Sequence, residues 1–130
     1  MPSAIKILVV EDDRFLLSMY ADKFKAERFD VSVAADGIQA LQTAKEERPA
    51  VILLDVLLPK MSGFEVLAAL KKDPDTKDIP VILLTNLSQR DDINKGAELG
   101  AADFLIKAHF MPNEVVSKVR ALLAKDPVHT

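Results

Sequence analysis

The sequence predicts an α/β fold in which five helices cover both faces of a parallel five-stranded sheet. Short apolar runs alternate with helix-length stretches throughout the chain. The expected strands are roughly Ile5–Val10, Val31–Ala34, Val51–Leu54, Ile79–Leu84 and Phe104–Ile106. Strands that are apolar on both faces are typical of parallel sheets buried between helices. Strict strand–helix alternation with right-handed crossovers gives a doubly wound sheet, and 130 residues are too few for an eight-fold barrel.

The stretches between these runs carry apolar residues at helical spacing. Four of the expected helices have a clear apolar stripe, in chain order Leu17, Tyr20, Ala21 and Phe24; Gly37, Ala40, Leu41 and Ala44; Gly63, Val66, Leu67 and Leu70; and, after Pro112, Val116, Val119 and Leu123. The fourth helix has the weakest stripe, Ile93, Gly96, Ala97 and Gly100. Its two glycines and small apolar area lead us to expect the most mobile helix of the fold. Four phenylalanines are expected in or near the core, namely Phe15, Phe24, Phe29 and Phe64.

The composition limits the classes of function. The chain is 49% hydrophobic and 28% charged, as folded globular proteins are. A net charge of -3 gives no electrostatic reason to bind nucleic acid or an anionic membrane directly. The absence of cysteine excludes disulfides and thiolate metal sites. Because no segment resembles a signal peptide or a membrane span, we expect a cytoplasmic protein in which residues 1–130 form one domain and 125–130 a frayed tail.

Reactive side chains stand at the ends of four of the five apolar runs. Glu11 and Asp12 follow the first run, Asp55 the third, Thr85 the fourth and Lys107 the fifth. Ligands of open α/β sheets bind at the carboxyl ends of the strands, so we expect these side chains to meet at one edge. Carboxylates, a hydroxyl and an ammonium group together suit a phosphoryl group held beside a divalent cation.

The acidic triplet after the first run allows two interpretations. Mg²⁺ prefers oxygen ligands and needs only one or two carboxylates, whereas adjacent carboxylates would repel a bare phosphate. The glycine-rich loops that bind nucleotide phosphates are absent from the sequence. The alternative is an acidic helix N-terminus, which the helix dipole favours. Asp13, the last residue of the triplet, is expected to serve as such a cap.

Asp55 ends a fully apolar run, where an ionised carboxylate is rarely placed without a partner. A helix cap or turn is the alternative explanation for this residue. Ser62, with Glu65 three residues later, already has the pattern of a cap for the next helix. Thr85 and Lys107 are ordinary strand-end residues when taken singly, and they gain weight only from their order and spacing relative to the acidic residues.

With these segments in place, the chain resembles the receiver domain of two-component response regulators over essentially its whole length. The matching segments are ILVVEDD, VILLDVLLPKMSGFEVL, PVILLT and GAADFLIK. This resemblance implies a flavodoxin-like fold with strand order 2-1-3-4-5. It also implies that Asp55 accepts a phosphoryl group in a Mg²⁺-dependent reaction, with Mn²⁺ as an alternative cation. The implied metal ligands are Glu11, Asp12, Asp55 and the backbone carbonyl of Leu57.

The resemblance assigns the remaining residues to switching and signalling. Thr85 would bind the phosphoryl oxygens after switching, Lys107 would pair with the phosphoryl group, and Phe104 would be the aromatic switch. The implied donor is a sensor histidine kinase or a phosphotransfer protein. The fourth helix, fifth strand and fifth helix would form the output surface, for a downstream protein or a second copy of the chain, with no direct contact to nucleic acid or membrane.

Two functions from other classes remain as alternatives. One is a protein-interaction module that acts without phosphorylation, against which the complete set of acidic residues, Thr85 and Lys107 argues. The other is a Mg²⁺-dependent phosphohydrolase with an aspartate nucleophile. Such an enzyme would need a second acid two residues after the nucleophile, where this chain has Leu57. A receiver, by contrast, is not an enzyme and promotes only its own phosphoryl transfer and slow dephosphorylation.

The chain departs from the receiver pattern beside the expected site. Lys107 is followed by Ala108 where receivers usually have proline, and Thr85 is followed by Asn86 where a small residue is usual. In receiver domains the residues two after the acceptor and two after the threonine flank the path of an attacking water, and the resemblance places the apolar Leu57 and Leu87 at these positions. These three residues, Leu57, Asn86 and Leu87, are therefore expected to tune the hydrolysis rate. Since neither leucine can orient a water molecule, we expect a long-lived phosphorylated state.

Overall fold

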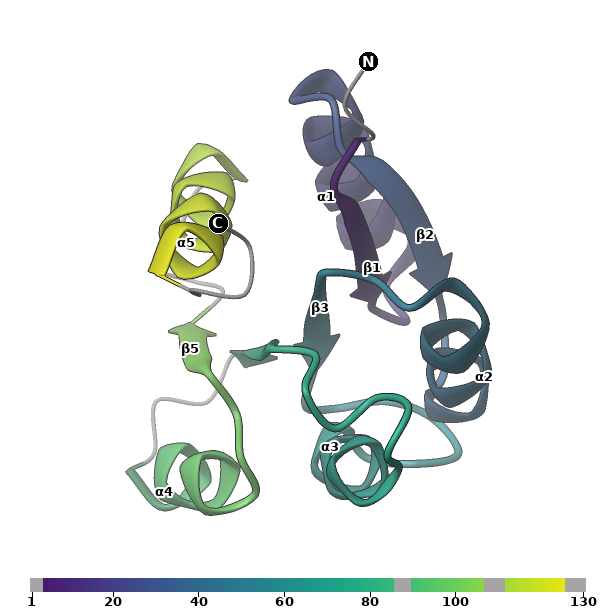
Figure 1. Ribbon diagram of the computed structural model, residues 1–130, viewed down its shortest axis with the longest axis vertical. Helices are drawn as coiled ribbons and strands as arrows, with labels where there is room; N and C mark the ends of the chain where they lie inside the picture. The colour runs from purple at the N-terminus through teal and green to yellow at the C-terminus, as the bar shows by residue number, and fades with distance from the viewer. Residues whose placement is uncertain (1–3, 86–89, 107–111, 126–130) are drawn as a thin grey trace.

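Five parallel strands form one sheet in the order β2-β1-β3-β4-β5 (Figure 1). The structure is a computed structural model that describes residues 4–85, 90–106 and 112–125, with side chains for 4–85, 93–106 and 113–124. The strands are β1 (Lys6–Val10), β2 (Asp30–Ala34), β3 (Val51–Asp55), β4 (Val81–Thr85) and β5 (Asp103–Ile106). Every pairing is parallel, from Val10 beside Ala34 at one side of the sheet to Thr85 beside Ile106 at the other. The predicted fold and strand order are therefore confirmed.

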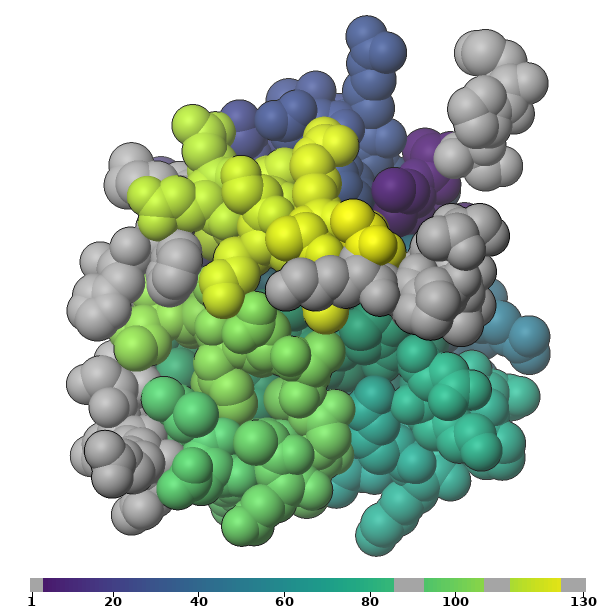
Figure 2. Space-filling view, turned by 60° about the vertical axis from the view of Figure 1, so that its left-hand side comes forward, coloured from purple at the N-terminus to yellow at the C-terminus, as the bar shows by residue number. Residues whose placement is uncertain are grey.

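Five helices cover the two faces of the sheet. They are α1 (Arg14–Ala26), α2 (Gly37–Glu47), α3 (Gly63–Lys72), α4 (Arg90–Glu98) and α5 (Pro112–Lys125). One apolar core lies between the sheet and α1 with α5, and includes Phe24 and Val119. The other lies on the opposite face, under α2 and α3, and includes Ala40 and Leu67. In the space-filling view α5, in yellow, lies above α4 and β5, in green, on one side of the molecule (Figure 2).

Side-chain caps fix where the first three helices begin, and therefore where the loops at the carboxyl edge end. The Asp13 carboxylate accepts hydrogen bonds from the backbone N–H groups of Phe15 and Leu16 at 2.9 and 3.1 Å. The Ser62 hydroxyl accepts one from the Glu65 N–H at 3.2 Å. Both expected caps are confirmed, and each satisfies N–H groups that have no partner within the helix.

The structure corrects three details of the sequence-based prediction. Strands β3 and β4 each end one residue later than expected, so that Asp55 and Thr85 belong to the strands themselves, and β4 begins at Val81 and not at Ile79. Phe15 is not in the core, because its side chain is 75% exposed. Two of the four residues of the α4 stripe are also wrong: Ala97 is exposed, and Gly100 lies beyond the end of the helix with φ at +99°.

Candidate functional site

The central strands carry the acidic side chains to one edge of the sheet. Glu11 directly follows β1, and Asp55 is the last residue of β3. Because β1 pairs with β3, with Val10 beside Leu54, these two residues leave the sheet as neighbours. The Glu11 N–H donates to the Ala34 carbonyl at 3.1 Å, which extends the pairing with β2 to the edge of the site.

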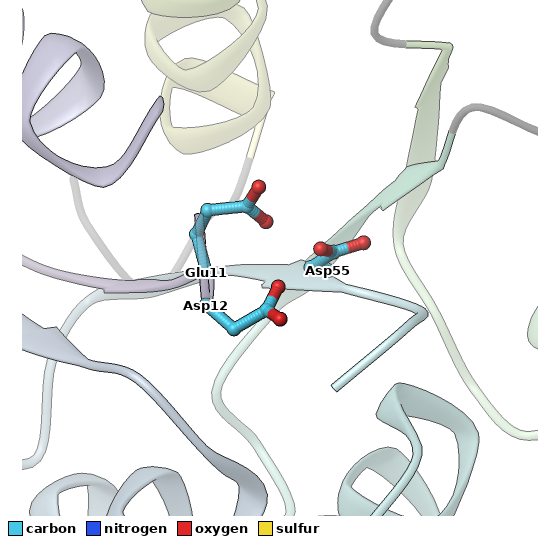
Figure 3. Close-up of side chains that lie close together, drawn as sticks. All are labelled: Glu11, Asp12 and Asp55. Atoms are coloured by element: carbon cyan, nitrogen blue, oxygen red, sulfur yellow. The ribbon is translucent and has the colours of Figure 1, made fainter. Parts of the chain in front are cut away.

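Three carboxylates meet at this edge. Oxygen atoms of Glu11, Asp12 and Asp55 all lie within 4.8 Å of one another. Figure 3 shows these side chains gathered around one space at the ends of β1 and β3. Glu11 is 1% exposed and Asp55 5% exposed, whereas Asp12 faces solvent. The structure thus brings together the acidic residues that the sequence analysis selected.

Two buried carboxylates and a third beside them suit a hard divalent cation. Like charges at this separation repel one another, and burial removes the water that would otherwise stabilise them. An all-oxygen donor set open to solvent on one side is the type that Mg²⁺ accepts while keeping several waters. The residues present therefore fit a Mg²⁺ site.

The loop between β3 and α3 begins with a hydrogen bond to the carboxylate of Asp55. The Leu57 N–H donates to Asp55 Oδ1 at 3.2 Å, which fixes the rotation of the carboxylate and directs the chain around it. The Leu57 side chain is 62% exposed. Its backbone carbonyl as a metal ligand stays a prediction.

Gly63 lets α3 start directly against the backbone of Asp55. A Cβ atom at position 63 would lie 2.2 Å from the Asp55 carbonyl oxygen and 2.7 Å from Val56 Cα. The Gly63 N–H donates to the Val56 carbonyl at 2.7 Å and closes the loop. Any side chain here would push α3 away from the end of β3, so glycine is required by the close approach.

Asp36, which is not among the residues predicted for the site, caps α2 close to the same loop. Its carboxylate accepts from the Gln39 N–H at 2.8 Å, and the Gln39 side-chain oxygen accepts from the Ala35 N–H at 3.1 Å. That hydrogen bond from Gln39 is the main reason that the pKa of Asp36 is lowered; burial acts against it, and the ammonium of Lys60 lowers the pKa further. The spacing of Asp36 and Gln39 is that of a capping box, a signal present in the sequence.

The remaining predicted residues lie on β4, β5 and the segments after them. Thr85 is 1% exposed at the end of β4, next to β3. Phe104 is half-buried on the face of the sheet covered by α3 and packs against that core. Asn86, Leu87 and Lys107 lie outside the described residues, so their expected roles stay predictions. The register Thr85–Ile106 places β4 and β5 side by side at this edge.

The comparisons with known proteins agree with this geometry. Residues 7–120 match the family described as the response regulator receiver domain. The chain is 40% identical over 121 residues to the DNA-binding response regulator MtrA of Mycobacterium tuberculosis, which is 93% of this chain and 51% of MtrA. The chain therefore spans about half the length of that relative.

Solved structures show the same fold with a similar extent. The chemotaxis response regulator CheY4 of Vibrio cholerae aligns with a TM-score of 0.86 and 29% identity, over 92% of this chain and 98% of that one. The receiver domain of the sensor histidine kinase PA1611 of Pseudomonas aeruginosa aligns with a TM-score of 0.83 and 26% identity, over 92% and 97% of the two chains. That structure has a magnesium ion coordinated in its active-site cleft.

This chain belongs to the response regulator receiver domain family. It has the phosphoacceptor function of that family in two-component signalling, and receiver domains are in general signalling modules rather than enzymes. Within the described residues, no helix is long and apolar enough to cross a membrane.

Proposed function

We propose that Asp55 is the phosphoacceptor and that Glu11 and Asp12 hold Mg²⁺ beside it. The observation that carries this assignment is the meeting of three carboxylates within 4.8 Å at the ends of β1 and β3. Of the three, only Asp55 ends a strand and carries its own loop around its carboxylate, through the hydrogen bond from Leu57. Glu11 and Asp12 follow β1 on the neighbouring side and face that carboxylate.

The proposed reaction is an in-line displacement at phosphorus. A carboxylate oxygen of Asp55 forms the new P–O bond, the P–N bond of a phosphohistidine donor breaks, and its electron pair leaves on the imidazole nitrogen. When bound, Mg²⁺ supplies positive charge that neutralises the phosphoryl oxygens in the loose transition state. The protein's own contribution is positional: β1 and β3 fix the carboxylates, and the Leu57 N–H fixes the rotation of the acceptor.

The proposed partners are proteins. A sensor histidine kinase or a phosphotransfer protein would supply the phosphoryl group, as kinase-linked receivers among the similar structures suggest. The net charge of -3 gives this chain no attraction for the phosphates of nucleic acid. The output surface would be built from α4, β5 and α5, which lie together on the side seen in Figure 2. Phosphorylation adds charge and acceptor oxygens near Thr85, which biases the position of α4.

Phosphorylation with a small donor tests the assignment without knowledge of the kinase. Purified protein is treated with acetyl phosphate or phosphoramidate plus Mg²⁺, and acid-labile phosphate is measured. Asp55→Asn should abolish the label, and Asp12→Ala should raise the Mg²⁺ concentration required. Asp13→Asn is the matched control, because Asp13 is the adjacent acid but caps α1, a role that asparagine also fills.

The outcomes separate the receiver from its alternatives. Undiminished labelling of the Asp55→Asn protein would contradict the acceptor assignment. No labelling of the wild-type protein would favour an interaction module that acts without phosphorylation. Continuous release of inorganic phosphate from phosphate esters, without a stable label, would favour the phosphohydrolase.

A further inference from the structure

The start of α2 lies directly on the loop that follows the proposed acceptor. We call this the α2–loop contact, formed by Asp36 and Gly37 on one side and Lys60 and Met61 on the other. Asp36 Oδ2 lies 3.5 Å from Lys60 Nζ. Asp36 is only 7% exposed, and its other oxygen accepts the Gln39 N–H. Its carboxylate is therefore fixed by α2 and presents one oxygen to the loop.

Gly37 shows how closely the backbones approach. A Cβ atom at position 37 would lie 2.6 Å from Met61 Cβ, 3.1 Å from the Met61 carbonyl oxygen and 2.9 Å from Val66 Cγ2. Real Cβ atoms essentially never come that close to another heavy atom, so α2 has no clearance over the loop. The loop cannot move toward α2, and the ion pair of Asp36 with Lys60 opposes movement away from it.

The same loop carries the backbone carbonyl of Leu57, which the resemblance to receiver domains implies as a further ligand of the cation. It is fixed at its start by the Leu57 N–H on the Asp55 carboxylate and at its end by the Gly63 N–H on the Val56 carbonyl. Lys60, in the middle, has φ at +69°, a backbone conformation that costs energy for a residue with a Cβ atom. Within the middle of the loop the Met61 N–H donates to the Pro59 carbonyl at 2.8 Å, and the ion pair with Asp36 adds a contact from α2.

We propose that Asp36 and Lys60 are positioning residues for the cation site, because their ion pair holds the loop so that the Leu57 carbonyl stays beside the carboxylates. This inference rests on the proposed function, in which Mg²⁺ binds at Glu11, Asp12 and Asp55. Residues beyond the direct ligands commonly set metal affinity by orienting those ligands. Here the orienting contact comes from a different strand–helix unit of the fold, α2, which faces the loop from the side.

A simple electrostatic effect makes the opposite prediction for one variant. If Asp36 and Lys60 acted only through their charges, Asp36→Asn would weaken Mg²⁺ binding and Lys60→Met, which removes a positive charge, would strengthen it. If their contact positions the loop, both substitutions weaken binding. The sign of the change in Lys60→Met therefore distinguishes the two mechanisms.

The test measures the Mg²⁺ dissociation constant by calorimetric or NMR titration of the full chain. We expect Asp36→Asn and Lys60→Met each to weaken binding about two- to fivefold, the fold-change that matches an exposed ion pair of modest strength. Lys60→Arg, which keeps the ion pair, should restore wild-type affinity. Methionine and arginine both retain a Cβ atom, so the backbone cost at position 60 cancels in the comparison.

Lys45, near the end of α2, offers a matched control for Lys60. Its Nζ lies 3.5 Å from Asp73 Oδ2, and its side chain is 60% exposed, compared with 59% for Lys60. It pairs with the far end of α3 and not with the loop. Lys45→Met removes one positive charge, as Lys60→Met does, and should leave the Mg²⁺ affinity unchanged.

A second readout needs no metal. In the metal-free protein, Lys60→Met should speed amide exchange at Leu57, Met61 and Gly63, whereas Lys45→Met should not. Tighter or unchanged Mg²⁺ binding by Lys60→Met, or unchanged exchange at these amides, would overturn the inference. That failure is distinct from failure of the proposed function, which would appear as labelling of the Asp55→Asn protein or as no Mg²⁺ binding by the wild type.

Discussion

Gly96 is the point at which α4 contacts Phe104, the expected aromatic switch. A Cβ atom at position 96 would lie 2.3 Å from Phe104 Cζ and 2.6 Å from Leu83 Cδ1. Gly96 is buried, whereas the residues on either side of it in α4 are exposed. We predict that Gly96→Ala destabilises the wild-type protein but stabilises a protein that already carries Phe104→Ala.

Two opposing terms give the size of the effect. Alanine is favoured over glycine inside a helix by about 0.5–1 kcal/mol. Insertion of a methyl group into a packed contact costs about 1–3 kcal/mol. The net change in the wild type is therefore a loss of up to about 2.5 kcal/mol. Without the Phe104 ring, the Leu83 side chain has room to move away from the new methyl group. Only the helix preference of alanine over glycine then remains, and the free energy of unfolding rises by about 0.5–1 kcal/mol. The coupling energy of the two substitutions is then about 1–3 kcal/mol.

Urea unfolding followed by far-UV circular dichroism measures all four proteins of the cycle. This signal suits a chain with no tryptophan and a single tyrosine. Phe104→Leu is an additional background in which part of the side chain is kept, and it should give an intermediate coupling energy. An effect of Gly96→Ala with the same sign in every background, or additivity within about 0.5 kcal/mol, would refute the packing explanation.

Two further predictions concern the lifetime of the phosphorylated state and the backbone at a helix end. The Leu57 side chain, 62% exposed beside the proposed acceptor, cannot orient a water molecule. The phosphorylated protein should therefore decay slowly, and Leu57→Asn should speed loss of label by up to about 10²-fold. Decay of the wild type within seconds, or no acceleration in the variant, would contradict this prediction. Arg48 ends α2 in a left-handed backbone conformation with φ at 46°, which glycine adopts at lower cost. Arg48→Gly should therefore raise the free energy of unfolding by about 0.5–1 kcal/mol. The ion pair that this substitution removes, with Asp75 at 3.8 Å, is exposed and contributes little. Lys45→Gly, inside the same helix, should lower it by about 1 kcal/mol, and a gain in that control would show that the φ angle at Arg48 is not the cause.

The meeting of the acidic side chains could be predicted from the sequence because it depends on strand direction. Parallel strands that alternate with helices have their carboxyl ends at one edge, so residues that follow the apolar runs converge there. The structure confirms this convergence for Glu11, Asp12 and Asp55. The boundaries of β3 and β4 were one residue short because a polar side chain ends an apolar run without ending the ladder of backbone hydrogen bonds. The Val56 N–H donates to the Leu84 carbonyl beyond Asp55.

The position of Phe15 could have been predicted correctly with the helical period alone. At about 100° per residue, Phe15 points about 200° away from Leu17, on the side of α1 opposite the stripe that ends at Phe24. The aromatic residue type favours a core position, but the helical period places the Phe15 ring on the exposed side of α1. The same lesson applies to α4, where Gly100 fits the period but ends the helix, since its φ of +99° suits a turn.

The α2–loop contact could not be predicted from the alternation of strands and helices along the chain. Asp36 and Lys60 belong to the segments after β2 and β3, and these strands lie on opposite sides of β1 in the sheet. The chain crosses from β2 to β3 and from β3 to β4 in the same direction along the sheet, so α2 and α3 lie on the same face, where the start of one helix meets the loop of the other. The proposed acceptor lies at the end of a single strand, whereas the proposed placement of the Leu57 carbonyl depends on a neighbouring strand–helix unit. Two receivers with identical acidic residues and acceptor should therefore differ in Mg²⁺ affinity when the residues at positions 36 and 60 differ, which is the comparison that the Asp36 and Lys60 variants make within one chain.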